Sequence, residues 1–311
     1  MAGQKLGKIG LIGAGAVGSF YGLQLFQNGQ DIHFYLRSNF EKVRENGFSL
    51  VHHKPARRVE KIENPPIYSD THSIGACDWI IIATKATVND QIGELVKPMV
   101  SEDTSFLSLQ NGMGNVENLA GLFGKERIIV GGLCFTCINR THPDRIESLL
   151  PGYIQFGEQD TSLSEKATNL VKAFECSGIK VRSSESLDEA LWRKLCWNVP
   201  FNGLSIIGGG ITTDLILKDK ELRMRAHQLM IEIQHGAQAH GITIEDSFID
   251  KQFSLTEPMG AYKPSSLIDF QEGKAVEVEA IWGEPMRRGL AKGVAMPELT
   301  KLYDELLKQT C

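Results

Sequence analysis

The sequence predicts an α/β protein, with an N-terminal doubly wound sheet followed by a C-terminal all-α region. In the first half, short apolar runs rich in β-branched residues alternate with helical patterns, as in parallel sheets with crossover helices. A glycine-rich turn, Gly13–Gly18, joins the first such run to the first helix. From Ser186 onward the pattern is mostly helical. We therefore expect two domains, residues 1–185 and residues 186–311.

The glycine-rich turn stands between a predicted strand and a predicted helix. The run Ile9–Ile12 is too short for a helix and suits a buried strand, and the helical stretch ends at Asn28-Gly29. Only glycine permits both the tight turn and the close approach of a diphosphate, so the G-x-G-x-x-G spacing indicates a Rossmann dinucleotide-binding unit. A tight turn without a ligand is the alternative. The expected cofactor-binding residues of this turn are Gly13, Ala14, Gly15, Ala16, Val17 and Gly18.

The residue after the second strand indicates which dinucleotide binds. This strand covers Asp31–Leu36 and is followed by Arg37. An NAD-binding unit usually has a carboxylate at this end of the strand, whereas an arginine can pair with the 2′-phosphate of NADP. Asp31 lies at the opposite end of the strand. We therefore expect NADP(H) as the cofactor, and a solvated surface arginine is the alternative.

The rest of the first region continues the alternation of strands and helices. The expected helices are 40–46, 89–100, 116–123 and 165–176, and the expected strands are 48–53, 57–62, 78–85, 105–109, 127–138, 143–158 and 179–183. Ligands bind at the carboxyl ends of the strands in such sheets. Lys85 and Asn111 occupy such ends, and both are therefore candidates for the site.

The second region begins with a capping box, Ser186-Leu-Asp-Glu189, which starts a helix. Further helices are expected at 215–240, 265–271, 276–292 and 297–308. In the first helix, Lys194, Asn198 and Asn202 recur every fourth residue and form one polar stripe. Asparagine is a poor helix former, so two on one face require a reason. The stripe either faces a binding cleft or is simply solvated.

The composition excludes several classes of function. A net charge of −5 over 311 residues argues against nucleic acid or an anionic membrane as the main partner. No apolar run is long enough to span a membrane, and the N-terminal MAGQKLGK lacks a signal-peptide core, so a cytoplasmic location is expected. The cysteines lie mostly in apolar surroundings, which suits reduced thiols, and no metal site is expected. They are Cys77, Cys134, Cys137, Cys176, Cys196 and Cys311.

Several motifs occur in one order over nearly the whole chain. They are GAGAVG, Arg37, Ala83-Thr84-Lys85, Gln110-Asn111-Gly112, Trp192-x-Lys194-x3-Asn198-x3-Asn202, and Pro264-Ser265…Asp269…Glu277…Gly283. With these motifs the sequence resembles the ketopantoate reductases, the 2-dehydropantoate 2-reductases of pantothenate biosynthesis. The resemblance implies an oxidoreductase that reduces 2-dehydropantoate (ketopantoate) to (R)-pantoate with NADPH. It also implies that the first domain binds NADP and that the helical domain carries the substrate and catalytic residues.

The resemblance assigns a role to each polar residue. Lys194 would be the general acid, which suits a ketone that gains negative charge on its oxygen as it accepts hydride. Glu277 would be the catalytic carboxylate, and its spacing to the neighbouring motifs favours it over Glu279. The substrate would be bound by Asn111, Asn198, Asn202 and Ser265, and the cofactor would be contacted by Lys85 and Asn111 in addition to the glycine turn and Arg37.

One departure from the family pattern lies on the substrate side. Many relatives have a further asparagine ten residues after Asn202, where this chain has Thr212. The alternatives are therefore an NADPH-dependent reductase of another branched 2-oxo acid, or a sensor that binds NADP(H) without turnover. A pairing of Lys194 with Glu277 argues against the sensor, which needs no proton donor. The apolar content of the C-terminal helices is compatible with a homodimer.

Overall fold

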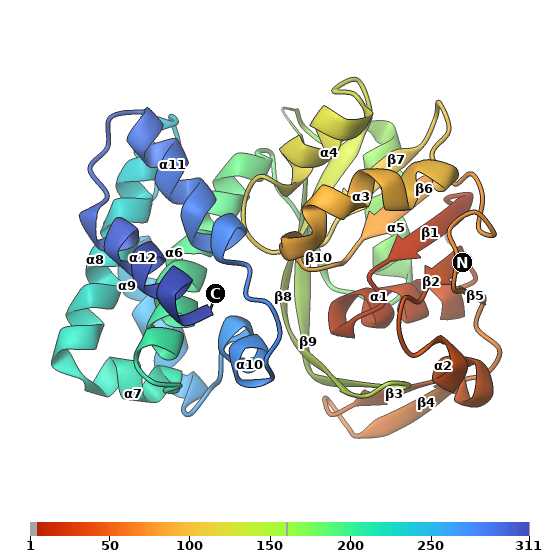
Figure 1. The fold of residues 1–311 in the computed structure, drawn as a ribbon, viewed down its shortest axis with the longest axis horizontal. Helices are drawn as coiled ribbons and strands as arrows, with labels where there is room; N and C mark the ends of the chain where they lie inside the picture. The colour runs from red at the N-terminus through yellow and green to blue at the C-terminus, as the bar shows by residue number, and fades with distance from the viewer. Residues whose placement is uncertain (1–4, 160, 311) are drawn as a thin grey trace. The chain divides into compact units, whose positions relative to one another are not determined.

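The computed structural model describes residues 5–159 and 161–310 and forms two compact units (Figure 1). The sheet unit contains the residues up to Gln110 and Asn115–Leu187; the helical unit contains Asn111–Gly114 and the residues from Asp188. We call Asn111–Gly114 the Asn111 segment. A sequence-based division at residue 185 does not anticipate that this segment belongs with the helices. Cys311 and the N-terminal residues 1–4 lie outside the described residues.

The sheet unit is built on one mixed sheet. The described residues form ten strands in the order β4-β3-β9-β8-β7-β6-β1-β2-β5, with β10 paired to β9. The strands are β1 (Lys8–Ile12), β2 (Asp31–Tyr35), β3 (Phe48–His52), β4 (Arg58–Ile62), β5 (Ile67–Tyr68), β6 (Trp79–Ile82), β7 (Ser105–Ser108), β8 (Ile129–His142), β9 (Arg145–Glu158) and β10 (Val181–Ser183). Strand β1 pairs in parallel with β2 on one side and β6 on the other, and β6 pairs in parallel with β7.

The helices of the sheet unit lie between its strands along the chain. They are α1 (Ala16–Gln27), α2 (Phe40–Asn46), α3 (Asn89–Val96), α4 (Asn115–Phe123) and α5 (Glu165–Cys176), with short turns η1 (Ala86–Val88) and η2 (Lys97–Met99). The connection from β1 to β2, which contains α1, and the connection from β6 to β7, which contains α3, run in opposite directions across the sheet. Right-handed crossovers therefore place α1 and α3 on opposite faces. Helix α1 contacts α5, and α3 contacts α4. The predicted doubly wound Rossmann-like fold is confirmed.

Local sequence explains where these elements begin and end. Ile9 and Leu11 of β1 are fully buried, as expected for a strand covered on both faces. Helix α1 ends at Gln27, and Gly29, just beyond the C-cap Asn28, has a φ of 80°, the left-handed conformation that terminates helices. Helix α5 begins at Ser164, whose side chain accepts a hydrogen bond from the Ala167 amide.

The remaining elements form the helical unit, as the sequence predicts for this region. They are α6 (Leu187–Ile207, its first residue in the sheet unit), α7 (Thr213–Lys218), α8 (Lys220–Ala239), α9 (Asp246–Thr256), η3 (Glu257–Met259), α10 (Ser265–Gln271), the π-helical turn η4 (Glu279–Gly283), α11 (Glu284–Ala291) and α12 (Pro297–Thr310). No helix within the described ranges is long and apolar enough to cross a membrane.

One predicted helix, residues 215–240, is wrong because the structure divides it into α7 and α8. Asp219 separates the two helices and has an extended backbone conformation. Its carboxylate accepts a hydrogen bond from the Leu222 amide and so caps the start of α8. A capping residue between two helical patterns can be mistaken for a polar position on one continuous helix.

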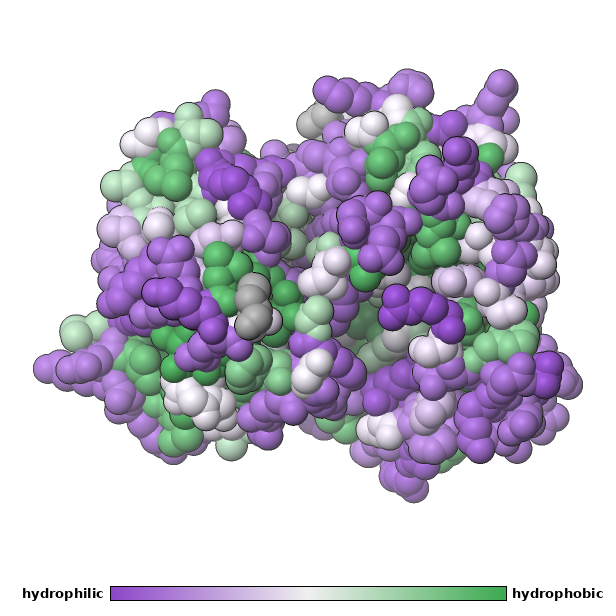
Figure 2. Space-filling model, viewed as in Figure 1, coloured by the Kyte–Doolittle hydropathy of each residue, from purple (hydrophilic) through white to green (hydrophobic). Residues whose placement is uncertain are grey.

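The face of the molecule drawn in Figure 2 is largely hydrophilic. Purple side chains prevail over the face in Figure 2, with smaller hydrophobic patches between them. The apolar side chains are gathered inside instead, in one core for each unit. The core of the helical unit contains Trp192 and Trp282, both fully buried. Each unit therefore has the interior of an independent folded domain.

Candidate active site

Three of the predicted cofactor-binding positions lie at one edge of the sheet. The glycine turn follows β1, Arg37 follows β2 and Lys85 follows β6. These strands are parallel neighbours, so their carboxyl ends share one edge. Arg37 is exposed, and Lys85 is half-buried at the residue before η1. Because β2 lies on one side of β1 and β6 on the other, the order of the strands reverses at β1. In doubly wound folds, ligands bind at the carboxyl ends of the strands at such a point.

The glycine turn has the shape that a diphosphate needs. A Cβ atom on Gly13, whose φ is 90°, would lie 2.3 Å from the Thr84 amide nitrogen, so the turn tolerates no side chain there. Gly18 is equally restricted, because its Cβ would lie 2.3 Å from the Gly13 carbonyl oxygen. At Gly15 the nearest atom would be 4.0 Å away, which leaves the backbone open. No acidic residue occupies the first turn of α1, so the positive end of the helix is not neutralised.

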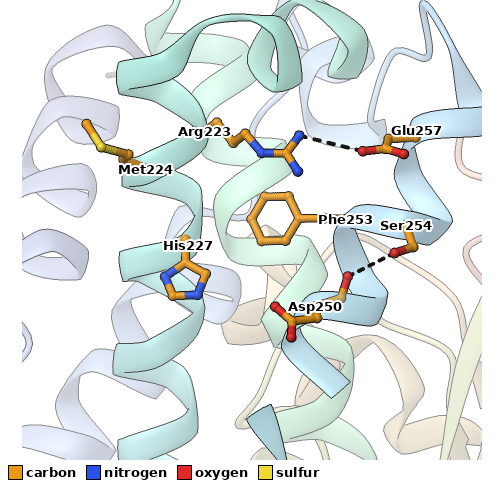
Figure 3. A pocket seen from close by; sticks show the side chains of 7 residues that line it. All are labelled: Arg223, Met224, His227, Asp250, Phe253, Ser254 and Glu257. Carbon is orange, nitrogen blue, oxygen red and sulfur yellow. Dashed lines mark hydrogen bonds and ion pairs between the residues drawn. The ribbon is translucent and has the colours of Figure 1, made fainter. Parts of the chain in front are cut away.

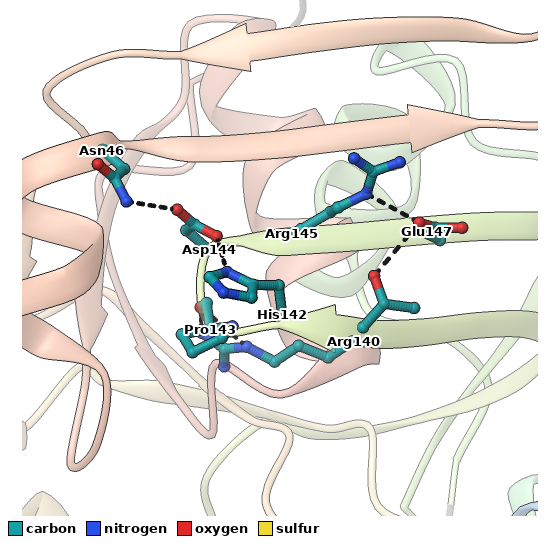
Figure 4. Close-up of polar contacts among 8 residues, drawn as sticks. Asn46, Arg140, His142, Pro143, Asp144, Arg145 and Glu147 are labelled. Atoms are coloured by element: carbon teal, nitrogen blue, oxygen red, sulfur yellow. Dashed lines mark hydrogen bonds and ion pairs between the residues drawn. The ribbon is translucent and has the colours of Figure 1, made fainter.

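Arg140, near the end of β8, adds a cation that the sequence analysis missed (Figure 4). Its guanidinium donates a hydrogen bond to the carbonyl of Ala14 in the glycine turn and, through Nε, to the Pro143 carbonyl at 3.1 Å. The nearby carboxylate of Asp144 is instead engaged by Asn46 and His142, at 2.8 and 2.5 Å. Within the described ranges, no carboxylate forms an ion pair with Arg140. Partial burial lowers the pKa of Arg140, and the charge of Asp144 opposes that shift.

A group of side-chain amides holds the chain on both sides of the Asn111 segment. Gln110 Nε2 donates to Asn89 Oδ1 at 2.7 Å and to Thr84 Oγ1 at 3.3 Å. Asn89 Nδ2 in turn donates to Asn115 Oδ1 at 2.9 Å. The residues that precede and follow the Asn111 segment are therefore linked to each other within the sheet unit.

The structure brings two of the predicted site residues together in the helical unit. Lys194, on α6, donates a hydrogen bond from Nζ to Oδ1 of Asn111 at 3.0 Å. Both side chains are half-buried. A lysine that is fixed by an amide oxygen has a defined direction for its remaining N–H groups, which a flexible surface lysine lacks.

Asn202, two helical turns after Lys194, lies in a different environment. Only 2% of Asn202 is exposed, and its Oδ1 accepts a hydrogen bond from the Ser266 amide at 3.0 Å. The Ser265 hydroxyl lies 3.5 Å from the same oxygen, and Asn202 Nδ2 donates to the Asn198 carbonyl at 3.1 Å. Asn202 therefore fixes the N-terminus of α10 to α6, while Ser265 is exposed and Asn198 is half-buried.

The two candidate carboxylates, Glu277 and Glu279, differ sharply in their surroundings. Glu277 is only 4% exposed. Glu279 is exposed, accepts a hydrogen bond from Arg287 at 2.8 Å and another from the Tyr303 hydroxyl. Partial burial opposes the effect, but the hydrogen bonds from Tyr303 and Arg287 lower the pKa of Glu279. Glu279 is thus a surface ion-pair partner, which leaves Glu277 as the buried carboxylate.

Thr212, the departure from the family pattern, lies at the residue before α7. Its hydroxyl donates to Asp214 Oδ1 at 2.5 Å, and Lys218 donates to the other oxygen of Asp214 at 2.8 Å. Hydrogen bonds from Lys218 and Thr212 lower the pKa of Asp214. An asparagine at this position would have to replace this arrangement at the start of α7.

A separate hollow opens between α8 and α9 and contains none of the predicted site residues (Figure 3). Arg223 lies over the ring of Phe253, at 5.0 Å, and 3.7 Å from the carboxylate of Glu257. The residues that line the hollow are Arg223, Met224, His227, Asp250, Phe253, Ser254 and Glu257. Within the described ranges, no cluster of three or more histidine, cysteine or acidic side chains could hold a metal ion.

Family models cover both units. The description "Ketopantoate reductase PanE/ApbA" matches residues 9–161, and "Ketopantoate reductase PanE/ApbA C terminal" matches residues 186–309. The chain belongs to the ketopantoate reductase family. The resemblance inferred from the sequence motifs is confirmed, and the protein is a 2-dehydropantoate 2-reductase-like oxidoreductase of this family.

Individual known proteins match nearly the whole chain. A 2-dehydropantoate 2-reductase of Nostoc sp. is 36% identical over 304 residues, which cover 96% of this chain and 94% of the relative. The crystal structure of 2-dehydropantoate 2-reductase from Geobacter metallireducens has a TM-score of 0.92 and 36% identity, covering 97% and 100% of the two chains. A D-mandelate dehydrogenase solved with NADH and anilino(oxo)acetate has the same fold, with a TM-score of 0.86, 22% identity and coverage of 97% and 98%.

Proposed function

We propose that the protein reduces 2-dehydropantoate to (R)-pantoate with NADPH. The observation that carries this proposal is the hydrogen bond between Lys194 and Asn111, which orients an ammonium group in the helical unit. Membership of the ketopantoate reductase family supports the reaction class. A sensor that only bound NADP(H) would not need a directed proton donor.

In the proposed reaction, the protein supplies a proton and holds the substrate. NADPH, when bound, supplies the hydride that adds to the ketone carbon. Lys194 donates a proton from Nζ to the ketone oxygen, which becomes the hydroxyl of the product, and stabilises the negative charge that develops there. Asn111 orients Lys194, and Glu277, the buried one of the two candidate carboxylates, would be the second catalytic group. Asn198 and Ser265 would bind the polar groups of the substrate, and Asn202 would position α10.

The cofactor would be held by the edge of the sheet unit. Gly15 and the N-terminal turn of α1 suit the diphosphate, because the backbone is open at Gly15 and the first turn of the helix carries no acidic residue. Arg37 would pair with the 2′-phosphate of NADPH, and Lys85 would contribute a second cation. Arg140, whose guanidinium already contacts the Ala14 carbonyl, would add positive charge beside the diphosphate.

The experiment that tests the reaction is steady-state oxidation of NADPH by the purified protein with ketopantoate and a panel of other 2-oxo acids. We expect the highest kcat/KM with ketopantoate. A higher value with another branched 2-oxo acid would retain the chemistry and contradict the proposed substrate; Thr212 would then be the first residue to examine. Tight NADPH binding without turnover of any of these acids would favour the sensor.

Replacement of Lys194 tests the mechanism. We expect Lys194→Met to lower kcat by about 10²- to 10⁴-fold, the usual contribution of a general acid, with little change in the affinity for NADPH. Lys301, on α12, is an exposed lysine outside the predicted site, and Lys301→Met serves as the matched control. Full activity of Lys194→Met would contradict the assignment of the general acid.

The cytoplasmic location and the homodimer remain predictions.

A further inference from the structure

A π-helical turn in the helical unit lies next to the residue that orients Lys194. In this turn, η4, the amide of Glu284 donates to the carbonyl of Glu279, five residues earlier. An ordinary α-helix would direct that amide to the carbonyl of Ala280 instead. Turns of this kind are rare, and they occur frequently at functional sites.

Pro285 completes the effect of the π turn. The next amide in the π pattern would come from residue 285, but proline has no N–H to donate. The carbonyl of Ala280 therefore has neither an α-helical nor a π-helical donor, although Ala280 is only 8% exposed. It accepts a hydrogen bond from the Met113 amide at 2.8 Å instead. A buried carbonyl requires such a partner, so the turn holds the Asn111 segment.

Gly112 allows the segment to lie directly on the turn. Its φ is 84°, and a Cβ atom at this position would lie 2.4 Å from both the carbonyl carbon and the carbonyl oxygen of Ala280. That distance is too short for any side chain, and the obstacle is backbone that cannot rotate away. The residue before Gly112 is Asn111, which accepts the hydrogen bond from Lys194.

We propose that the π turn, Pro285 and Gly112 act together to position Asn111, and through it the ammonium of Lys194. The carbonyl of Ala280, which has no helical donor, accepts the Met113 amide and thereby fixes the position and direction of the Asn111 segment on the helical unit. The amide oxygen of Asn111 is then in position to accept the hydrogen bond from Lys194. This inference rests on the proposed function of Lys194. Gly112 and Pro285 are positioning residues, which act through Asn111 and take no part in the reaction itself.

The substitution Gly112→Ala tests the positioning, with Gly114→Ala as its matched control. Both glycines belong to the Asn111 segment and have nearly equal φ angles, 84° and 85°. The strain of adding a Cβ atom at positive φ is therefore similar in the two variants. At Gly114, however, the Cβ atom would make only ordinary contacts, with the Glu284 side chain at 3.5 Å and beyond. Only Gly112→Ala pushes the segment away from Ala280.

We expect Gly112→Ala to lower kcat at least about tenfold, because a misplacement of about 1 Å can cost 10²-fold in rate. Gly114→Ala should retain kcat within about twofold of the wild type. Its thermal midpoint should fall less than that of Gly112→Ala, because it carries the strain of a positive φ without the clash with Ala280. The affinity for NADPH, measured by quenching of protein fluorescence, should be similar in both variants. Equal kcat values in the two variants would overturn the proposal.

A second readout does not depend on turnover. Reductive methylation followed by peptide mass spectrometry measures the reactivity of Lys194 directly. We expect labelling of Lys194 to be about fivefold faster in Gly112→Ala than in Gly114→Ala, which corresponds to the loss of a hydrogen bond of about 1 kcal/mol. Equal labelling would overturn the positioning. A wild-type protein that reduces none of the 2-oxo acids would contradict the proposed function alone, since the labelling would still decide the positioning.

Pro285→Ala provides a variant without a steric clash, in case Gly112→Ala fails to fold. It restores an amide that can donate to the carbonyl of Ala280 and compete with Met113. We expect a smaller loss of kcat, about threefold to tenfold, and faster labelling of Lys194 with an unchanged affinity for NADPH. Wild-type kcat and wild-type labelling in Pro285→Ala would overturn the role of the proline.

Discussion

Two arginines at the edge of the sheet unit differ in what their side chains contact. Arg37 is exposed at the end of β2. Arg140 is half-buried and donates to the carbonyls of Ala14 and Pro143. The first has the freedom to meet a ligand phosphate, and the second is already fixed beside the glycine turn. They should therefore contribute to different parts of a bound dinucleotide.

Direct binding measurements distinguish the two arginines. We expect Arg37→Ala to weaken NADPH about 10- to 100-fold and to leave NADH nearly unchanged, because a hydrogen bond to a charged group contributes about 1.5–3 kcal/mol. Arg140→Gln should weaken both cofactors by a similar factor of about 10, because they share the diphosphate. Titration of each variant with NADPH and with NADH, followed by fluorescence, gives the four dissociation constants.

Arg58 and Arg145 provide the controls for these variants. Both are arginines of the sheet unit that already pair with a glutamate, Arg58 with Glu60 and Arg145 with Glu147. Their glutamine variants should bind both cofactors as the wild type does. Equal loss of NADPH and NADH in Arg37→Ala would show that the 2′-phosphate lies elsewhere. Wild-type affinities in Arg140→Gln, with a lower thermal midpoint, would reduce Arg140 to a structural link between β8 and the glycine turn.

Among the elements, the π turn is tied to its neighbours by a small polar cluster. Glu279 accepts hydrogen bonds from Arg287, on α11, and from Tyr303, on α12. The hydrogen bond to Glu279 raises the pKa of Tyr303, and partial burial adds to it. The pKa of Glu279 is lowered, since these hydrogen bonds outweigh the effect of partial burial. The cluster thus stabilises the ionised carboxylate and the neutral phenol.

Tyr303→Phe tests this cluster through its pH dependence. We expect a loss of about 1 kcal/mol in the free energy of unfolding at pH 7, where Glu279 is ionised. A lowered folded-state pKa contributes stability above the ordinary value of 4.5, and this stability is lost as the pH falls through the folded value. The difference between the variant and the wild type should therefore shrink below about pH 4.5. Urea unfolding at a series of pH values measures it.

A double-mutant cycle supplies the control. In a Glu279→Gln background, the carboxylate is absent and Tyr303→Phe should cost much less, with no dependence on acidic pH. A constant difference between Tyr303→Phe and the wild type from pH 7 to pH 4 would mean that the tyrosine acts through packing. The stability of the π turn would then not depend on this ion pair.

For the molecule as a whole, the sequence could predict most elements of the sheet unit. Short buried strands and capped helices follow from local patterns, and the motif residues were found at strand ends. Strand β8 was expected to end at residue 138, and its last residues, 139–142, were missed because they are polar and pair with β9. Arg140 is one of them, so its contact with the glycine turn could not be anticipated.

Tertiary relations explain the rest of what the sequence could not predict. The Asn111 segment follows a strand of the sheet unit, and only the folded structure shows that it packs on η4. The proline at 285 could be read as an ordinary first-turn residue of α11, since proline is common there. Its effect on the Ala280 carbonyl requires knowledge of the hydrogen bonds around it. Residue patterns indicate which groups take part, whereas their partners depend on distant parts of the chain.

The membership of the Asn111 segment in the helical unit has a consequence for how the protein can be divided. A fragment that begins at residue 188 would contain nearly all of α6 and every later helix. It would still lack the Asn111 segment, four residues of its own compact unit. The carbonyl of Ala280 would lose its donor, and Lys194 its amide partner. A hybrid enzyme made by joining halves of two relatives would face the same mismatch. Exchange of the helical half between relatives therefore requires that the Asn111 segment be exchanged with it.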